Sequence, residues 1–266
     1  MKIVFSDARK IQQFANIFAN LKNFTDNVCI YFKQDGIYIQ CMDDSHCCLF
    51  ECKLYMTWFH SYEYDEANDQ ACVGVNIVML NKVLNTWNDT QTMAIIVENG
   101  SDKISINFEK GENNNIHFNK FFQLSLVNIE NELMDVKLFE TIVDLTIESK
   151  IFCALMGQLI IFNETLTLTF NEENIECLSS GMDGSLKASI SVNDVKEYAI
   201  PESTVLTQSY SLRYVQLMCQ FNKLSNEMVM GFSSDMPMIM KYSLSENDKT
   251  ESFVRIHLAP KITEEE

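Results

Sequence analysis

The sequence predicts an α+β protein made of two similar halves. Four segments with the apolar spacing of helices alternate with runs of strand-like residues, and both halves show these elements in the same order. The second and fourth helical segments begin at Asn76 and Tyr210, 134 residues apart, which is about half of the chain. The stretch "DGIYIQCMDDSH" in the first half also resembles "ENIECLSSGMDGS" in the second. Order, spacing and local sequence agree, which favours a duplicated domain over a coincidence.

The first half opens with an amphipathic helix over residues 8–22. Its apolar residues recur at helical spacing at Ile11, Phe14, Ile17, Phe18 and Leu21. Its polar face is expected to carry Arg9, Gln13, Asn16 and Asn20. We then predict strands over 27–33, 36–42 and 48–54, a second helix over 76–87, and a hairpin of strands 92–98 and 103–109 around the turn "NGSD".

The second half repeats this order. The predicted elements are a strand over 141–147, a helix over 150–161, strands over 165–171, 174–180 and 186–192, a fourth helix over 210–223, a hairpin over 227–244 and a strand over 252–258. Between the halves, residues 127–141 lack clean periodicity and mix acids with Leu133, Met134, Val136 and Leu138. We therefore predict a connector at 127–141 between an N-terminal domain (1–126) and a C-terminal domain (142–266).

The composition excludes several classes of protein. With 47% apolar residues the 266-residue chain can bury a sizeable core, and no apolar run is long enough for a membrane span. The sequence becomes polar after five residues, which is not expected of a secretory signal. Nine Cys without paired spacing favour free thiols in a reducing compartment. A net charge of −17 argues against a protein that coats nucleic acid with its whole surface, but it leaves room for a local basic surface.

The four predicted helices differ from the rest of the chain in charge. The chain has 37 Asp+Glu against 20 Lys+Arg, yet these helices hold no acid and seven basic residues: Arg9, Lys10, Lys22, Lys82, Lys150, Arg213 and Lys223. Fully buried helices would exclude both signs of charge, so the basic residues indicate exposed faces. On the fourth helix one polar stripe holds Arg213, Gln216, Gln220 and Lys223. A sparse positive surface of this kind suits a polyanion and would hold DNA loosely enough to slide.

Five segments of the chain resemble one known family. They are "DGIYIQCMDDSHCCLFECKL", "VGVNIVMLNKVLN", "YSLRYVQL", "FSSDMPMIMKYSL" and "HLAPKITEEE". In this order and near this spacing they closely resemble the proliferating cell nuclear antigen family, the sliding clamps of DNA replication. Each motif alone is weak, but five in register are strong, and the match covers nearly the whole chain. The resemblance implies two similar clamp domains joined by an interdomain connector, with no catalytic activity, no metal and no cofactor.

The resemblance also implies an assembly and its partners. Three chains would close head to tail into a homotrimeric ring, with helices lining the hole and antiparallel sheets outside. The edge around "NIHFNKFFQL" would pair with the edge around "NIECLSS" of a neighbour. Duplex DNA would pass through the ring without sequence preference, and an ATP-dependent clamp loader would open it. DNA polymerase and other proteins would bind it through short peptides. The expected location is the nucleus, or a cytoplasmic replication site if the chain is viral.

The family's functional positions can be matched to residues of this sequence. Lys22, Lys82 and Arg213 match basic residues that face DNA in the family. The positions that match a partner-peptide pocket beneath the connector are Met42, His46, Leu49, Leu133, Met134, Val136, Pro237, Ala259, Pro260 and Ile262. An apolar groove of this kind accepts aliphatic and aromatic anchors of a short peptide.

Three departures from the family pattern change these expectations. The third helix offers only Lys150 where the family has several basic residues, and Gln220 stands where the family has a Lys, so strong DNA contact is not expected. His257 replaces the aromatic residue before "LAPK", which predicts an altered, pH-dependent peptide preference. Divergent segments such as "FHSYEYDEANDQ" suggest a distant, viral lineage.

Two other classes of protein remain as alternatives. A subunit of a heterotrimeric checkpoint clamp usually lacks the docking tail that "HLAPKI" provides here. A metal-dependent enzyme would use the cysteine-rich stretch "CMDDSHCC" and Cys52. That stretch has no CxxC spacing, and on an extended strand Cys48 and Cys52 share a face with Phe50 and Leu54 while Cys47 points away. Buried free thiols are therefore the favoured interpretation. The adjacent Asp43 and Asp44 diverge on an extended chain, which does not favour a hydrolase.

Overall fold

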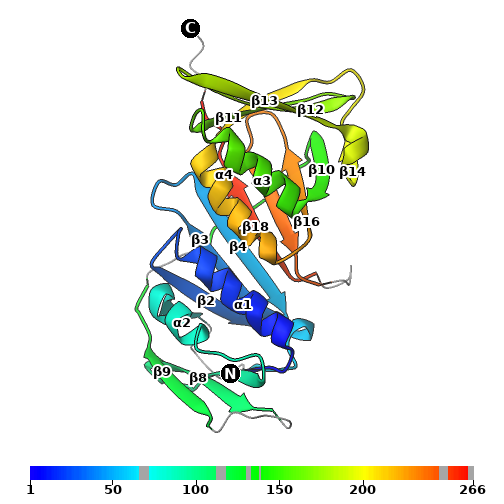
Figure 1. Cartoon of the computed structure of the whole chain (residues 1–266). Helices are drawn as coiled ribbons and strands as arrows, with labels where there is room; N and C mark the ends of the chain where they lie inside the picture. The colour runs from blue at the N-terminus through cyan, green and yellow to red at the C-terminus, as the bar shows by residue number, and fades with distance from the viewer. Residues whose placement is uncertain (66–71, 112–117, 130–132, 138, 246–250, 263–266) are drawn as a thin grey trace. The chain divides into compact units, whose positions relative to one another are not determined.

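The computed structural model describes residues 1–65, 72–111, 118–129, 133–137, 139–245 and 251–262 (Figure 1). The chain divides into two compact units. Unit 1 comprises Met1–Asp44, Phe50–Met134 and Leu244–Phe253, and unit 2 comprises Ser45–Leu49, Asp135–Ser243 and Val254–Glu266. The change from unit 1 to unit 2 at Met134 falls within residues 127–141, of which 130–132 and 138 lie outside the described residues. Leu138, expected among the exposed apolar residues of the connector, is one of these.

Unit 1 combines two antiparallel sheets with a pair of helices. Its strands are β1 (Lys2–Phe5), β2 (Asn27–Lys33), β3 (Gly36–Met42), β4 (Cys48–Tyr55), β5 (Ser61–Glu63), β6 (Cys72–Asn76), β7 (Gln91–Val97), β8 (Lys103–Lys110) and β9 (Lys120–Ser125). Its helices are α1 (Ala8–Leu21) and α2 (Ile77–Leu84), with a 3-10 turn η1 (Met56–Trp58). One sheet has the order β5-β1-β7-β8-β9, and the other contains the neighbours β6-β2-β3-β4.

Unit 2 repeats this plan. Its strands are β10 (Val143–Glu148), β11 (Thr165–Phe170), β12 (Asn174–Gly181), β13 (Gly184–Ser191), β14 (Glu197–Ala199), β15 (Leu206–Ser211), β16 (Glu227–Phe232), β17 (Met238–Ser243) and β18 (Phe253–Leu258). Its helices are α3 (Ser149–Leu159) and α4 (Leu212–Cys219), with 3-10 turns η2 (Val192–Asp194) and η3 (Gln220–Lys223). One sheet has the order β13-β12-β11-β15, and the other contains the neighbours β14-β10-β16-β17-β18. The described chain is thus mostly antiparallel sheet with few helices, which confirms the predicted α+β class.

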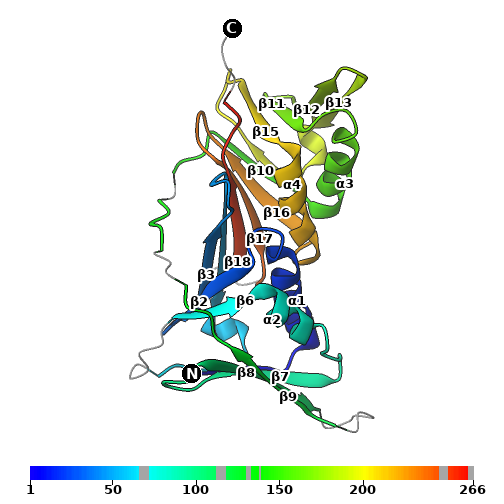
Figure 2. The ribbon, with the colours of Figure 1, turned by 90° about the vertical axis from the view of Figure 1, so that its left-hand side faces the viewer.

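In each unit the two helices lie side by side (Figures 1 and 2). In unit 1, α1 contacts α2, β1 and β7, while α2 contacts β2 and β6. The predicted apolar face of α1 is buried, and the ring of Phe14 lies 5.1 Å from that of Phe5 and 4.9 Å from that of Phe18. In unit 2, α3 contacts α4 and β10, and α4 contacts β15. Each helix therefore buries one side and leaves the other side open to solvent.

The structure corrects two details of the predicted helices. Tyr210, expected in the fourth helix, is a fully buried residue of β15 that pairs with Leu166 of β11, and the helix begins only at Leu212. Here the backbone bonds of the sheet override the apparent helical spacing. Gln13, expected on the polar face of α1, is buried together with Ile11 and Phe14. The second helix begins one residue later than predicted, because Asn76 caps it by accepting the N–H of Met79 at 3.0 Å, and it ends at Leu84 instead of residue 87.

The structure also corrects one of the two expected sheet edges. β9 is an edge strand, in agreement with the expectation for "NIHFNKFFQL", of which residues 115–117 lie outside the described residues. β12, which contains "NIECLSS", is not an edge, because it is paired with β11 on one side and with β13 along its whole length on the other. The free edge on that side of the sheet is β13.

The cysteine-rich segment forms part of the core. Cys48, Phe50, Cys52 and Leu54 are fully buried, and Cys47 is exposed, as strand alternation predicts. Burial raises the pKa of Cys41 to about 12 and raises that of Cys52 further, so both thiols stay protonated at neutral pH. Within the described residues, no three His, Cys, Asp or Glu gather as a metal site would require. None of the helices among these residues has the length and apolar character that a membrane span needs.

Candidate functional site

Most of the basic residues on the two helices of unit 1 are exposed to solvent. Asp7 precedes α1 and caps it, its Oδ1 accepting the backbone N–H of Arg9 at 2.8 Å. Arg9 and Lys22 are exposed at the two ends of α1. Lys82 is exposed in the last turn of α2, where a cation also interacts favourably with the helix dipole. Three cations of this unit are thus presented to solvent from the two helices.

Lys10 behaves differently from these three residues. Its side chain is half-buried, and its Nζ donates a hydrogen bond of 2.7 Å to the carbonyl oxygen of Trp58. The same Nζ lies 5.7 Å from the centre of the Trp58 ring, within range of a cation–π interaction. Lys10 is therefore held against η1, and a ligand would have to compete with Trp58 for its charge.

In unit 2 the open face of α3 is nearly uncharged. Lys150 is exposed in its first turn, but the residues that follow on this face are Ile151, Gln158 and, just beyond the helix, Ile161. Ile151 is 59% exposed and Ile161 is 73% exposed. Such side chains cannot bond to phosphate, so α3 offers a single basic contact.

The open face of α4 carries the polar stripe predicted from the sequence. Arg213, Gln220 and Lys223 are exposed, and Gln216 is half-buried. The stripe continues past the end of α4 because η3 follows without a break and keeps Lys223 exposed. Two of the three basic helix residues of unit 2 therefore lie on α4 and η3, and the third is Lys150 of α3.

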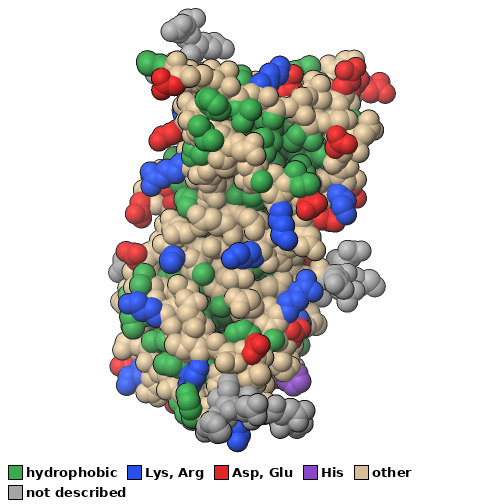
Figure 3. Space-filling model, in the orientation of Figure 1, with side chains coloured by type: hydrophobic (Ala, Val, Ile, Leu, Met, Phe, Trp, Pro, Cys, Tyr) green, Lys and Arg blue, Asp and Glu red, His purple; other side chains and the backbone are tan. Residues whose placement is uncertain are grey.

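Among the described residues, no carboxylate neutralises the charge of these helix faces. In the described part of the chain, none of the seven basic helix residues forms an ion pair with a carboxylate. Within each unit, Figure 3 shows Lys and Arg side chains as separate points among many neutral and hydrophobic side chains and some acidic ones. A polyanion could meet these cations directly, but it would meet few of them.

The connector is attached to unit 1 by a buried glutamine. Gln40 of β3 is only 2% exposed, and its amide makes two hydrogen bonds to the main chain of Met134. The N–H of Met134 donates to Gln40 Oε1 at 2.8 Å, and Gln40 Nε2 donates to the oxygen of Met134 at 3.1 Å. Gln40 Nε2 also lies 3.1 Å from the hydroxyl of Tyr38, which donates to Glu51 at 2.7 Å. This network fixes the main chain of Met134 and leaves its side chain exposed.

The C-terminal tail is held within unit 2 by a second set of bonds. The N–H of Ala259 donates to the oxygen of Cys47 at 2.9 Å, which joins the tail to the segment that carries His46 and Leu49. The N–H of Lys261 donates to the oxygen of Ser209 on the edge strand β15 at 2.7 Å. Lys261 Nζ also donates to Thr165 Oγ1 at 2.6 Å.

The residues matched to the peptide pocket divide between the two units. Unit 1 holds Met42, Leu133 and Met134, and unit 2 holds His46, Leu49, Val136, Pro237, Ala259, Pro260 and Ile262. Leu133, Met134, His46 and Ile262 are exposed, and the remaining six are half-buried. Ile262 is 94% exposed, as an apolar anchor for a partner would be.

Sequence reasoning missed the residues that hold these segments, and it misjudged one position. The sequence gives no sign of the roles of Gln40 and Lys261. On the strand "GIYIQCM" Gln40 alternates with Ile39 and Cys41, so its burial is not expected from the pattern. His257, expected to alter peptide preference, is buried at 6% exposure and does not belong to an exposed surface.

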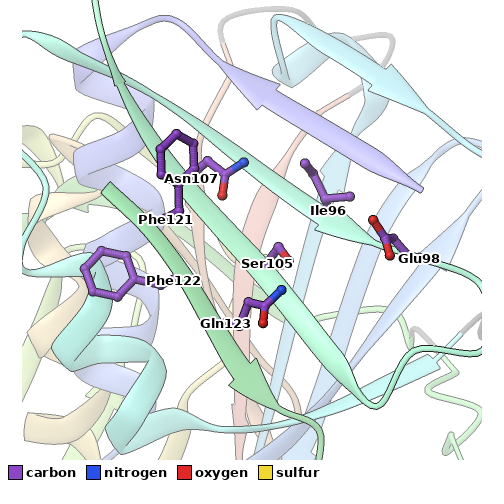
Figure 4. Close-up of a pocket in the computed structure, with 7 residues that line it drawn as sticks. All are labelled: Ile96, Glu98, Ser105, Asn107, Phe121, Phe122 and Gln123. Atoms are coloured by element: carbon purple, nitrogen blue, oxygen red, sulfur yellow. The ribbon is translucent and has the colours of Figure 1, made fainter. Parts of the chain in front are cut away.

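A separate hollow of about 460 Å³ lies on the five-stranded sheet of unit 1 (Figure 4). Its lining residues are Ile96, Glu98, Ser105, Asn107, Phe121, Phe122 and Gln123. It contains an acid and no base, which does not suit a phosphate. Phe121 lies on the edge strand β9 and is 66% exposed, so this rim of the hollow is apolar.

Comparison with known proteins links this arrangement to one family. A family model described as the N-terminal domain of proliferating cell nuclear antigen matches residues 8–133. Proliferating cell nuclear antigen of Chaetomium thermophilum is 28% identical over 238 residues, which cover 87% of each chain. The Saccharomyces cerevisiae protein of the same name is 23% identical over 260 residues, covering 95% of this chain and 96% of the relative. Proliferating cell nuclear antigen 1 of Plasmodium falciparum is 23% identical over 261 residues, covering 94% and 93%.

Proposed function

We infer that this chain belongs to the proliferating cell nuclear antigen family, because the family model and these relatives match it. The sliding clamps of this family are non-enzymatic scaffolds of DNA replication and repair. We propose that the chain forms a homotrimeric ring around duplex DNA. The ring tethers DNA polymerase and other replication and repair enzymes to the template. A clamp loader opens it, and it acts in the nucleus or, for a viral member, at a cytoplasmic replication site.

The charge of the helices is the observation that carries this proposal. In a chain of net charge −17, the open helix faces have cations without acids, and no described carboxylate pairs with them. Arg9, Lys22, Lys82, Lys150, Arg213 and Lys223 contact phosphates without reading bases, and Lys10 contributes less because it is bonded to Trp58. Six exposed cations per chain are enough to hold the duplex and too few to immobilise it.

Two free sheet edges support closure of the ring. β9 and β13 end their sheets with unpaired backbone groups, which antiparallel pairing with another chain would satisfy. We propose that β9 of one chain pairs with β13 of the next. Phe121 on β9 then loses its contact with water, which adds apolar burial to the backbone bonds.

Peptides of partner proteins dock beside the connector, at the ten residues matched to the family pocket. We assign residues 1–126 to the N-terminal clamp domain, 127–141 to the connector and 142–266 to the C-terminal clamp domain. The exposed Leu133, Met134 and Ile262 supply apolar contacts, and the bonds of Gln40 and Ala259 hold the segments that bear them. Preorganised segments bind with a smaller ordering cost.

Mass and DNA retention together test this function. Native mass spectrometry of the purified chain should give three copies, and rings loaded with a clamp loader and ATP should stay on circular DNA but leave linear DNA through its ends. A monomer at micromolar concentration would contradict the ring. A trimer that forms only with two other gene products would favour a heterotrimeric checkpoint clamp instead.

A further inference from the structure

Three elements of unit 2 bring hydrogen-bonding groups together around Cys153. Cys153 lies on α3, Cys219 is the last residue of α4, Asn222 lies on η3 and Tyr242 lies on β17. Cys153 Sγ is 3.5 Å from the carbonyl oxygen of Cys219, to which the protonated thiol donates. The side chains of Cys219, Asn222 and Tyr242 lie close enough to influence the Cys153 thiol, and the Tyr242 hydroxyl itself donates to the carbonyl oxygen of Met218 at 3.0 Å.

These neighbours make the two thiols chemically unequal. The hydrogen bond from Cys219 lowers the pKa of Cys153, and those from Asn222 and Tyr242 act in the same direction, against the effect of burial. The same bond, together with burial, raises the pKa of Cys219. Cys153 is therefore the thiol that ionises first, and Cys219 remains a protonated neighbour.

Exposure separates the two thiols in the same way. Cys153 is half-buried and can be reached from solvent, whereas Cys219 is 5% exposed. Cys72 provides a contrast within the chain. The residue is exposed, but partial burial of its thiol group and a hydrogen bond with the Cys29 thiol raise its pKa to about 12. Reactivity toward oxidants follows the thiolate, so exposure alone does not make Cys72 reactive.

We propose that Cys153 and Cys219 form a peroxide-reactive pair that closes to a disulfide between α3 and α4. In the first step the Cys153 thiolate attacks one oxygen of hydrogen peroxide. The S–O bond forms, the O–O bond breaks, and the departing hydroxide takes up a proton, leaving a sulfenic acid and one water. In the second step the Cys219 sulfur attacks the sulfenic sulfur. The S–S bond forms, the S–O bond breaks, and the hydroxyl group leaves with the proton of Cys219 as a second water.

The balance of this reaction requires only the hydroperoxide as oxidant. Two thiols are oxidised to one disulfide, and one peroxide is reduced to two waters. The pair lies wholly within unit 2, so the chemistry does not depend on ring formation or on DNA. Failure of the proposed clamp function would therefore leave this inference untouched.

Intact-mass measurement with peptide mapping tests the proposal on the full chain. Hydrogen peroxide, followed by proteolysis without reductant, should give a linked pair of peptides containing Cys153 and Cys219, and a thiol reductant should separate them. In the variant Cys219→Ser, oxidation should stop at a sulfenic acid on Cys153 that dimedone captures. Cys153→Ser should abolish both the link and the dimedone adduct. The matched control Cys72→Ser should form the link like the unmodified chain.

A competition on the unmodified protein keeps the test independent of any variant that folds poorly. At neutral pH, limiting iodoacetamide should alkylate Cys153 about tenfold or more faster than Cys72, because thiolate fraction governs the rate. Equal or faster alkylation of Cys72 would overturn the proposal. The absence of a Cys153–Cys219 link after peroxide treatment would also overturn it. So would a link that proves to join two different chains.

Discussion

Gln40 shows how one side chain can position a segment that is distant in the sequence. Replacing it with Leu removes both hydrogen bonds to the main chain of Met134 while keeping a side chain of similar size. We expect Gln40→Leu to destabilise the folded chain by about 1–3 kcal/mol, the usual cost of leaving buried polar groups unpaired. The Met134 amide should also exchange its hydrogen faster, which mass spectrometry after deuterium labelling measures.

The matched control for this change is Gln34→Leu, at an exposed position of the same unit. It should alter neither the unfolding midpoint nor exchange at Met134. Unchanged exchange in Gln40→Leu would show that other contacts hold the connector.

Leu133 and Met134 are expected to contribute to peptide binding through their side chains. Covering each of them with an apolar anchor of a partner peptide contributes roughly 1.5–3 kcal/mol before ordering costs. The double change Leu133→Ala and Met134→Ala should weaken a clamp-binding peptide by about tenfold or more in calorimetric titration, with the trimer intact.

A control pair of substitutions removes a similar amount of apolar surface at another place on the chain. Ile161→Ala and Met182→Ala truncate two side chains that are 73% and 107% exposed. This pair should bind the peptide like the unmodified chain. Equal affinity of both double variants would place the docking site elsewhere.

At the scale of elements, the proposed DNA contact depends on the basic residues of the helices. Arg213→Ala and Lys82→Ala remove one cation from the helix pair of each unit. If both contact phosphate, the slope of log affinity against log salt should fall by about two per chain, since each phosphate contact contributes about one. Polymerase stimulation or clamp loading should fall with it, while the mass of the trimer stays the same.

Lys103→Ala and Lys196→Ala form the control, because they remove the same charge from exposed positions outside the helices. Their salt slope should match that of the unmodified chain. A loss of slope equal to that of the helix variant would mean that net charge matters and the helix faces do not.

The uncharged face of α3 allows a gain of function. Gln158 is exposed on this helix and has no acid beside it within the helix. Gln158→Lys adds one cation, so loaded rings should stay longer on circular DNA and their salt slope should rise by about one per chain. The variant Gln158→Glu should shorten retention, and similar retention by the two variants would show that α3 does not face DNA.

Local patterns allowed most elements to be predicted, because each repeats with the period of a helix or a strand. They failed where partners distant in sequence decide the outcome. Tyr210 follows helical spacing but pairs with Leu166 in a sheet. The segment that forms β12 was expected at a sheet edge, but β13 pairs with it on that side. The basic residues of the helices could be selected because charge is visible in the sequence, and the structure leaves six of these seven exposed. Gln40 could not be assigned its role, since its partner lies 94 positions away.

At the scale of the whole molecule, ring closure should depend on the edge strand β9. Phe121→Ser leaves the backbone of β9 intact but removes an apolar side chain that is 66% exposed in the single chain. We expect the trimer to dissociate at a higher protein concentration, as sedimentation analysis would show. Met56→Ser, a change at η1 in the same unit, should leave the assembly unaltered, and equal behaviour of both variants would argue against β9 as the contact.

The bonds between Gln40 and Met134 have a consequence for how this protein can change over evolutionary time. Gln40 contacts only the main-chain nitrogen and oxygen of Met134, which every amino acid except proline supplies alike. The anchor therefore imposes almost no restriction on the side chain at position 134, which points into solvent. If position 134 contacts partner peptides as proposed, mutations there would change binding preference without detaching the segment, at little risk to the fold.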